Sequence, residues 1–371
     1  MKITKTPAPY ASAYRDALFR VTAGAQELVE LDIYDHADQR IVGRRRFKGQ
    51  TSYDVNVGGY ARSQFDVLPL YAVECTFAKP AGRIVRTTVR SAEAQASALL
   101  CAGTRTLFEW DALSAAPTTV KIAPNESDEI AVLPGGSALT AQAVLRGSSQ
   151  RSIELASQAP TDDLSVFCLK MSDLKAQVEN DGNDSLDRYG SMEIRIASGD
   201  ETVLTREYRL VPHYAGDVRL CWWNTFGQID YYTMRRPLAE GFAIGKERVL
   251  TAEGYAVTAS RRESRIRLVS DYESERTMRW LCGLLNAPKV WIAEDSRFVE
   301  ADRGSHRRVG RAVENRHGSA RGATRNLSKP VAMIRIFIDN READTDQHAA
   351  VSITLAVSSI TKIETNRTGY C

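Results

Sequence analysis

The sequence is poor in closely spaced cysteines. Its six cysteines stand far apart, and no two of them form a C-x-x-C pair. A structural zinc site usually brings at least one such pair of ligands, so this class of site is not expected. Most of the cysteines lie in apolar strings and are predicted to be buried free thiols. They are Cys75, Cys101, Cys168, Cys221, Cys282 and Cys371.

Long apolar runs are also missing. The N-terminal segment MKITKTPAPY lacks the apolar core of a secretory signal. The apolar stretch at residues 331–338 is broken by Arg335 and falls far short of the roughly 20 apolar residues that cross a bilayer. We therefore expect no signal peptide, no transmembrane segment and synthesis in a cytoplasm.

An excess of one charge is missing as well. The net charge is +3, with 43% hydrophobic and 26% charged residues, which is typical of a folded soluble protein. Attraction to nucleic acid would therefore need a local basic patch. The 371 residues are enough for two or three domains of roughly 100–200 residues each.

The motifs of the common enzyme classes are absent from the sequence. It has no phosphate-binding P-loop, no dinucleotide-binding G-x-G-x-x-G, no G-x-S-x-G elbow and no H-E-x-x-H helix. The five histidines are isolated from one another: His36, His213, His306, His317 and His348. We therefore predict no enzyme, no catalytic residue, no metal site and no cofactor. A pair of carboxylates across a cleft needs no linear motif, so a hydrolase stays an alternative.

The pattern that is present is that of β-strands. Residues 28–34 alternate apolar and acidic side chains, and residues 40–48 follow after a polar turn, which predicts a hairpin. Residues 79–82 (Lys-Pro-Ala-Gly) form a turn sequence between strands predicted at 70–77 and 83–89. We predict a mainly β fold with tandem antiparallel sandwich-like or barrel-like domains.

The breakers between strands divide the chain into three predicted domains. They are an N-terminal β domain at 1–90, a central β-sandwich-like domain at 91–213 and a C-terminal α+β domain at 214–371. Within the last, residues 273–286 form the one clear predicted α-helix, capped by Ser270 or Asp271 and stopped by Pro288. A turn is predicted at 241–245, followed by a strand at 248–259.

A basic segment at 303–329 interrupts the C-terminal domain. It is rich in Gly and Ser, has Glu314 as its only acid and cannot bury a core of its own. Three readings stay open: a solvated loop, an arm that orders against a neighbouring subunit, and, less favoured, a nucleic-acid contact. Its bases are Arg303, Arg307, Arg308, Arg311, Arg316, Arg321, Arg325 and Lys329.

An aromatic hairpin is the other unusual feature. Strands at 218–223 and 228–234 flank the turn Asn224-Thr225-Phe226-Gly227, and both faces of the first strand are apolar. Core packing is the favoured interpretation, with an inter-subunit contact or a carbohydrate-binding platform as alternatives. The aromatic residues are Trp222, Trp223, Phe226, Tyr231 and Tyr232.

The string at residues 220–234 resembles a hairpin in structural proteins of tailed phages and prophages. That hairpin reads aromatic-Asn-x-x-Gly-x-x-Asp-x-aromatic-Thr, and the later Trp280-Leu281 and the segment Ala287-Pro-Lys-Val-Trp291 resemble the same proteins. The resemblance covers about residues 217–300. It implies a virion component of the tail, baseplate or connector region, assembled in the host cytoplasm, and it carries over no catalytic residue.

These observations predict a non-enzymatic structural protein that assembles through contacts between subunits. Its expected partners are other virion or tail proteins and copies of itself. The alternatives are a carbohydrate-binding or surface-binding adhesin-like module and the hydrolase named above. Burial of Trp222 and Trp223 would argue against an aromatic platform on the hairpin.

Overall fold

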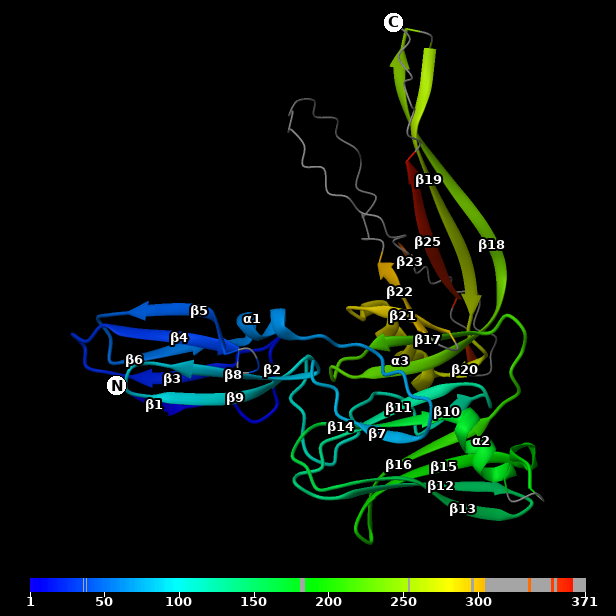
Figure 1. Ribbon diagram of the computed structural model, residues 1–371, viewed down its shortest axis with the longest axis horizontal. Helices are drawn as coiled ribbons and strands as arrows, with labels where there is room; N and C mark the ends of the chain where they lie inside the picture. Colours follow the sequence, from blue (N-terminus) through cyan, green and yellow to red (C-terminus); the bar gives the residue numbers. More distant parts are fainter. Residues whose placement is uncertain are drawn as a thin grey trace, which may run out of the picture.

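The computed structural model describes residues 1–35, 37, 39–180, 184–252, 254–294, 297–303, 333–334, 348–349 and 352–362. The fold is mainly β, as the strand patterns predicted, and most strand pairs are antiparallel. Figure 1 shows an N-terminal body to one side, a central body below and a C-terminal sheet from which a long arm projects. Among the described helices, none is both long and apolar enough to cross a membrane.

The N-terminal body consists of two sheets packed face to face. Phe19, Leu31 and Ile33 are completely buried between them. The predicted first hairpin is confirmed as β4 (Val29–Asp35) and β5 (Arg40–Phe47). The remaining elements are β1 (Lys2–Lys5), β2 (Ala11–Ser12), β3 (Leu18–Thr22), β6 (Ser52–Asn56), α1 (Gly58–Ala61), the 3-10 turn η1 (Arg62–Gln64), β8 (Ile84–Arg90) and β9 (Gln95–Cys101).

The central body also has two sheets, with strand orders β10-β16-β15-β12-β13 and β11-β14-β7. Strands β10 and β16 pair in parallel, so the first sheet is mixed. Helix α2 (Met171–Glu179) follows β14 directly. The other elements are β7 (Thr76–Ala78), β10 (Thr119–Ile122), β11 (Ser127–Val132), β12 (Leu139–Gly147), β13 (Gln150–Gln158), β14 (Ser165–Lys170), η2 (Leu186–Arg188), β15 (Tyr189–Ser198) and β16 (Glu201–Leu210).

The C-terminal sheet has the order β23-β22-β21-β17-β18-β19-β25. Helix α3 (Glu275–Asn286) packs against it, and its Trp280 and Leu284 are buried in the core shared with the central body. The elements are β17 (Val218–Trp223), β18 (Ile229–Thr251), β19 (Gly254–Val269), β20 (Glu273–Ser274), β21 (Val290–Glu294), β22 (Arg297–Arg303), β23 (Met333–Ile334), β24 (His348–Ala349) and β25 (Ser352–Lys362).

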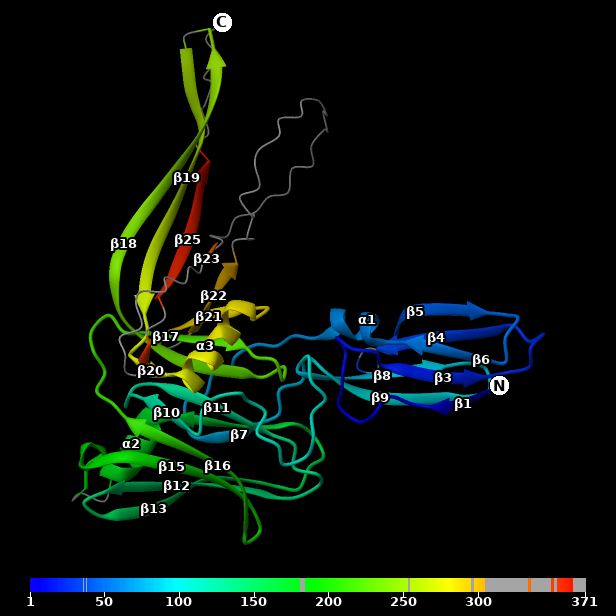
Figure 2. The ribbon, with the colours of Figure 1, turned by 180° about the vertical axis from the view of Figure 1, so that it is seen from behind.

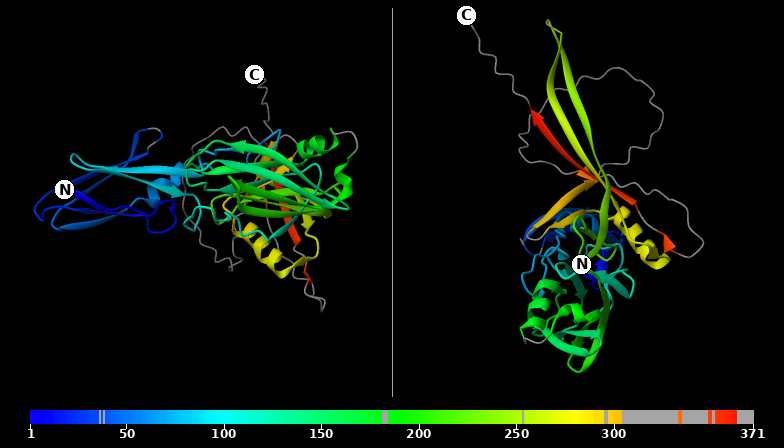
Figure 3. Two further views of the ribbon diagram at one scale, coloured as in Figure 1. Left: turned by 90° about the horizontal axis from the view of Figure 1, so that it is seen from below. Right: turned by 90° about the vertical axis from the view of Figure 1, so that its right-hand side faces the viewer.

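We call β18 from Arg235 onward, together with β19 and β25, the arm. Strand β17 ends its pairing with β18 at Met234, and beyond this point β18 pairs with β19, which in turn pairs with β25. The arm leaves the body and extends alone, as the two opposite views show (Figures 1 and 2). A view along a perpendicular direction shows the same projection (Figure 3, right).

The structure corrects four local predictions. The strand predicted at 70–77 is reduced to β7 (Thr76–Ala78), and the strand predicted at 248–259 is wrong, because β18 ends at Thr251 and its partner β19 begins at Gly254. The turn predicted at 241–245 is wrong, because these residues continue β18 and pair with Arg265 through Arg261 of β19. A glycine inside a strand weakens it, but the cross-strand pairing continues on either side of Gly241 and Gly245. Helix α3 is capped by Ser274, whose hydroxyl accepts from the Thr277 N–H, and not by Ser270 or Asp271.

The predicted domain ranges stay predictions. Two strands, however, lie on the other side of the predicted boundary at residue 90 from the sheet to which they belong. Strand β9 lies after residue 90 and pairs with β8 of the N-terminal body. Strand β7 lies before residue 90 and pairs with β14 of the central body. The segment between η1 and β7 therefore passes from one body to the other.

Candidate functional site

The aromatic hairpin of β17 and β18 lies in the core. Trp222 is 1% exposed and Trp223 7%, and each faces a different apolar cluster because successive side chains of a strand point to opposite faces. The Trp222 ring packs 5.1 Å from that of Trp280 in α3. Tyr231 and Tyr232 are buried and Phe226 is half-buried. The hairpin therefore presents no platform of exposed tryptophans.

The polar residues of the same hairpin hold its turn. The Asn224 side-chain oxygen accepts from the N–H groups of Phe226 and Gln228, and Gly227 has a φ of +77°, which a side chain rarely tolerates. Gly103 lies against this turn so closely that a Cβ there would stand 2.4 Å from the Phe226 carbonyl carbon. The turn is therefore clamped by the segment that leaves β9.

Asp230 is the centre of a buried network behind the turn. Its carboxylate accepts from Ser114 Oγ at 2.6 Å, Asn224 Nδ2 at 2.9 Å and Trp280 Nε1 at 2.7 Å. Burial raises the pKa of Asp230, although these donors act in the opposite direction. The network ties the hairpin both to α3 and to the loop before β10.

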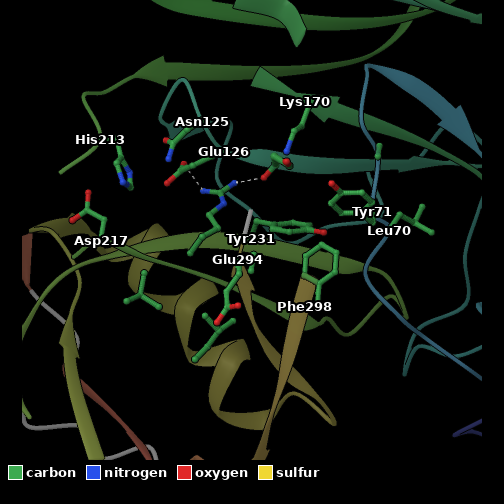
Figure 4. A pocket seen from close by; sticks show the side chains of 16 residues that line it. Leu70, Tyr71, Asn125, Glu126, Lys170, His213, Asp217, Tyr231, Glu294 and Phe298 are labelled. Atoms are coloured by element: carbon green, nitrogen blue, oxygen red, sulfur yellow. Dashed lines mark hydrogen bonds and ion pairs between the residues drawn. The ribbon is translucent and has the colours of Figure 1, made fainter. Parts of the chain in front are cut away.

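A cavity of about 570 Å³ lies where the central body meets the C-terminal sheet. Figure 4 shows its lining, with Leu70 and Tyr71 on one side and His213 and Asp217 on the other. The side chains come from the segment before β7, the start of β11, the linker before β17, and strands β21 and β22. Phe298 and Leu70 give the cavity an apolar wall.

The floor of the cavity is a buried ion pair. Arg219 donates to Glu126 Oε2 at 3.1 Å and to the Ser127 carbonyl at 2.9 Å, and its guanidinium lies 5.5 Å from the Tyr231 ring centre. Glu126 also accepts from the Ala123 N–H and from the Thr233 hydroxyl. These three donors hold the carboxylate in place.

The two other carboxylates that line the cavity are also paired with arginines. Glu294 accepts from Arg297 at 2.6 Å, and Asp217 Oδ2 lies 3.3 Å from Arg235 and accepts from the Tyr214 N–H. Asp217 differs in one respect: its side chain is 2% exposed, and its Oδ1 has no hydrogen-bond partner among the described residues. This oxygen is closed to solvent and has no donor among the described residues.

The end of the arm, residues 246–257, carries exposed apolar side chains. Leu250 is 69% and Tyr255 75% exposed, and the two are cross-strand partners. Arg248 is exposed and stands two residues before Leu250, so both lie on one face. We call Arg248, Leu250, Tyr255 and Val257 the tip face, because the register Arg248–Val257 and Leu250–Tyr255 places them together.

Of the contact residues predicted in the basic segment, the structure describes only Arg303. Arg303 is the last residue of β22, and the other predicted contact residues, Arg307, Arg308, Arg311, Arg316, Arg321 and Arg325, lie outside the described residues. Its three readings therefore stay predictions.

The described cysteines are free, and all of them except Cys282 are buried. The exposure of Cys282 corrects the expectation of burial for that thiol, while Cys371 lies outside the described residues. Burial raises the pKa of Cys75 and of Cys168 to about 12, which makes these thiols unreactive. Within the described ranges, no three His, Cys, Asp or Glu side chains gather as metal ligands.

Neither the tip face nor the cavity was predicted from the sequence. The cavity residues span Leu70 to Phe298 and meet only in the fold. No known protein-family model matches the chain, and a search of curated proteins finds no relative of it.

Proposed function

We propose that the chain is a non-enzymatic structural protein of a phage or phage-like particle, in the tail, baseplate or connector region. It acts through contacts with copies of itself and with other particle proteins. The observation that carries the proposal is the arm, which extends away from the body and exposes Leu250 and Tyr255 at its end. Exposed apolar side chains gathered in one place mark interaction sites.

The resemblance of residues 220–234 to a hairpin of tail proteins supports the same function. Asn224 and Gly227 form the turn of that motif, and Asp230 and Thr233 anchor its return strand to the core. The return strand is β18, which continues into the arm. The motif therefore fixes the root of the element that we assign to assembly.

The alternative functions have less support. An aromatic platform for carbohydrate would need exposed tryptophans, and Trp222 and Trp223 are buried. A glycoside hydrolase needs one carboxylic acid to give a proton and a second carboxylate to act on the substrate. Each carboxylate at the cavity is instead engaged by an arginine.

The test shortens the arm without touching the body. Residues 249–256 are replaced by Asn-Gly, which closes a two-residue hairpin between the paired Arg248 and Val257. We expect the full chain to self-associate in sedimentation velocity and the shortened chain to stay monomeric. The thermal unfolding of both should agree, because the removed side chains Val249, Leu250 and Tyr255 are exposed.

A matched control replaces residues 148–149, between β12 and β13, by Asn-Gly. This hairpin is also exposed but belongs to the central body. The control should associate like the full chain. A full chain that remains monomeric at the highest attainable concentration, or a shortened chain that associates equally well, would contradict the proposal.

A further inference from the structure

The cavity between the central body and the C-terminal sheet has a lining that fits a small molecule, independently of the proposed assembly function. We propose that it binds an organic anion with a flat apolar body, such as an aromatic monocarboxylate. The ammonium of Lys170 pairs with the charged group of this ligand, and the rings of Tyr71 and Phe298 cover its apolar part.

The first argument is the balance of charge in the lining. Each carboxylate that lines the cavity is already paired with an arginine, in the pairs Glu126–Arg219, Asp217–Arg235 and Glu294–Arg297. Lys170 lines the same cavity, and no carboxylate oxygen of the described residues lies within 4.0 Å of its Nζ. Lys170 is therefore the cation in this lining that is left for a ligand to neutralise.

The second argument is the direction of the Lys170 side chain. Lys170 ends β14 and is the cross-strand partner of Ser127 in β11, which lines the cavity as well. Cross-strand partners project from the same face of a sheet. Lys170 is half-buried, and Figure 4 shows it extending from β14 into the cavity. An ammonium that has lost part of its water gains from a charged partner, so this place favours an anion.

The third argument is the rest of the wall. Phe298 and Leu70 form an apolar side, and Tyr71, which is 55% exposed, adds a further ring at the rim. The volume of about 570 Å³ falls within the range of roughly 300–1,000 Å³ that is typical of small-molecule sites. Such sites combine apolar walls with a few polar groups that fix the orientation of the ligand. An inorganic anion would leave the apolar wall uncovered, which favours an anion with an apolar body.

A ligand in this place contacts more than one part of the fold. Lys170 belongs to the central body, Phe298 to β22 of the C-terminal sheet, and Tyr71 to the segment that leads into β7. These groups come together only in the folded chain, so the ligand binds the folded state and not the unfolded one. The midpoint of thermal unfolding should therefore rise with the concentration of the ligand.

The test compares two probes of the same shape, naphthoate and its neutral amide, naphthamide. Isothermal titration calorimetry on the full chain near neutral pH measures the dissociation constant of each. Naphthoate should bind about 10-fold more tightly than naphthamide, because only the carboxylate pairs with the Lys170 ammonium. Equal affinities for the two probes, or no binding of naphthoate up to about 1 mM, would overturn the proposal.

Two variants locate the binding in the cavity. Lys170→Gln should raise the dissociation constant of naphthoate about 10-fold and leave that of naphthamide unchanged. Tyr71→Ser removes an exposed ring and should weaken the binding of both probes. The matched control is Lys175→Gln, because Lys175 lies in α2 outside the cavity lining and pairs with Glu179. It should change neither dissociation constant.

The outcomes separate this proposal from the assembly function. If Lys170→Gln and Lys175→Gln bind naphthoate equally well, the cavity is not the site, and the assembly function is unaffected. Lys170→Gln should sediment like the unaltered chain, because Lys170 does not belong to the arm. If Lys170→Gln fails to fold, the comparison of the two probes on the full chain and on Tyr71→Ser still decides the proposal.

Discussion

At the scale of single residues, the resemblance motif can be explained by local structure. Asn224 satisfies two turn N–H groups, Gly227 adopts a positive φ, and Asp230 accepts three hydrogen bonds in the core. Thr233 donates to the buried Glu126. Each of these side chains has a role in folding, which is consistent with a motif that carries no catalytic chemistry.

Asp230 gives the first prediction at this scale. Asp230→Asn should destabilise the protein by about 1–3 kcal/mol, because the amide NH2 must face a donor on Ser114, Asn224 or Trp280. The pKa of Asp230 is higher in the folded state than in the unfolded chain. The wild type therefore loses stability as the pH rises from the unfolded-state pKa of this carboxyl to its folded-state pKa. The gap between wild type and variant, measured by urea unfolding from about pH 4 to about pH 7, should narrow as the pH rises.

Asp54 provides a control of opposite sign. A hydrogen bond from Arg20 lowers the pKa of this exposed carboxyl, so its contribution to stability is present above the ordinary pKa and is lost as the pH falls. With Asp54→Asn, measured from about pH 3 to about pH 5 around the ordinary pKa of aspartate, the gap should therefore widen as the pH rises. A gap for Asp230→Asn that also widens would contradict the assigned role of burial.

At the scale of elements, the root of the arm is held by charged groups. Arg235 of β18 donates to both oxygens of Asp271, which follows β19, and pairs with Asp217 of the linker before β17. Lys121 of β10 donates to Asp271 as well. Burial alone would raise the pKa of Asp271, but the hydrogen bonds from Arg235 and Lys121 together lower it. The Arg235 guanidinium thus holds the root of the arm to the linker before β17, and Asp271 links it in turn to Lys121 of the central body.

Arg235→Gln tests this attachment. The variant leaves Asp217 and Asp271 without their arginine, and we expect a loss of about 1–3 kcal/mol in the free energy of unfolding. Amide hydrogen exchange should accelerate in β18 and β19 near residues 229–235 and 268–271 more than in the N-terminal body. Arg279→Gln removes the exposed pair with Glu275. It should change the free energy of unfolding by no more than about 0.5 kcal/mol and should leave the exchange rates unchanged. If Arg235→Gln accelerated amide exchange equally in the N-terminal body, the central body and the C-terminal sheet, a local role for Arg235 would be contradicted.

At this scale, the sequence predicted the elements that depend on a local residue pattern and missed those that depend on a distant strand. The hairpins β4–β5 and β17–β18 follow from alternation around a polar turn, and α3 follows from helical spacing ended by Pro288. The arm was missed because Gly241 and Gly245 resemble turn residues, while in the fold they pair with Arg265 and Arg261 across the strands. That pairing is set by β19, which a local pattern cannot show.

At the scale of the whole molecule, a second buried ion pair joins all three parts of the chain. Arg83, at the start of the N-terminal sheet, donates to Glu129 of β11 at 2.6 Å and to Gln228 of the hairpin turn. Glu129 also accepts from Tyr231 and from the Leu70 N–H. The side chains of Arg83 and Glu129 are 0% and 3% exposed. Such a pair fixes how the bodies meet, and with them the cavity at their junction.

Removing one partner of this pair should therefore affect the whole molecule. Arg83→Met leaves Glu129 charged and buried, and we expect a loss of about 3–5 kcal/mol in the free energy of unfolding. The double variant Arg83→Met, Glu129→Met should recover part of that loss, because no unpaired buried charge remains. The same cycle on the exposed pair Arg20–Asp54 should give a much smaller coupling, because solvent screens both charges. Denaturant unfolding, followed by tryptophan fluorescence, measures the free energy of unfolding of the wild type and of each variant. The contrary outcome is a double variant that is less stable than Arg83→Met by the full cost of Glu129→Met alone. It would show that the two residues act independently and that the apolar contacts alone hold the junction.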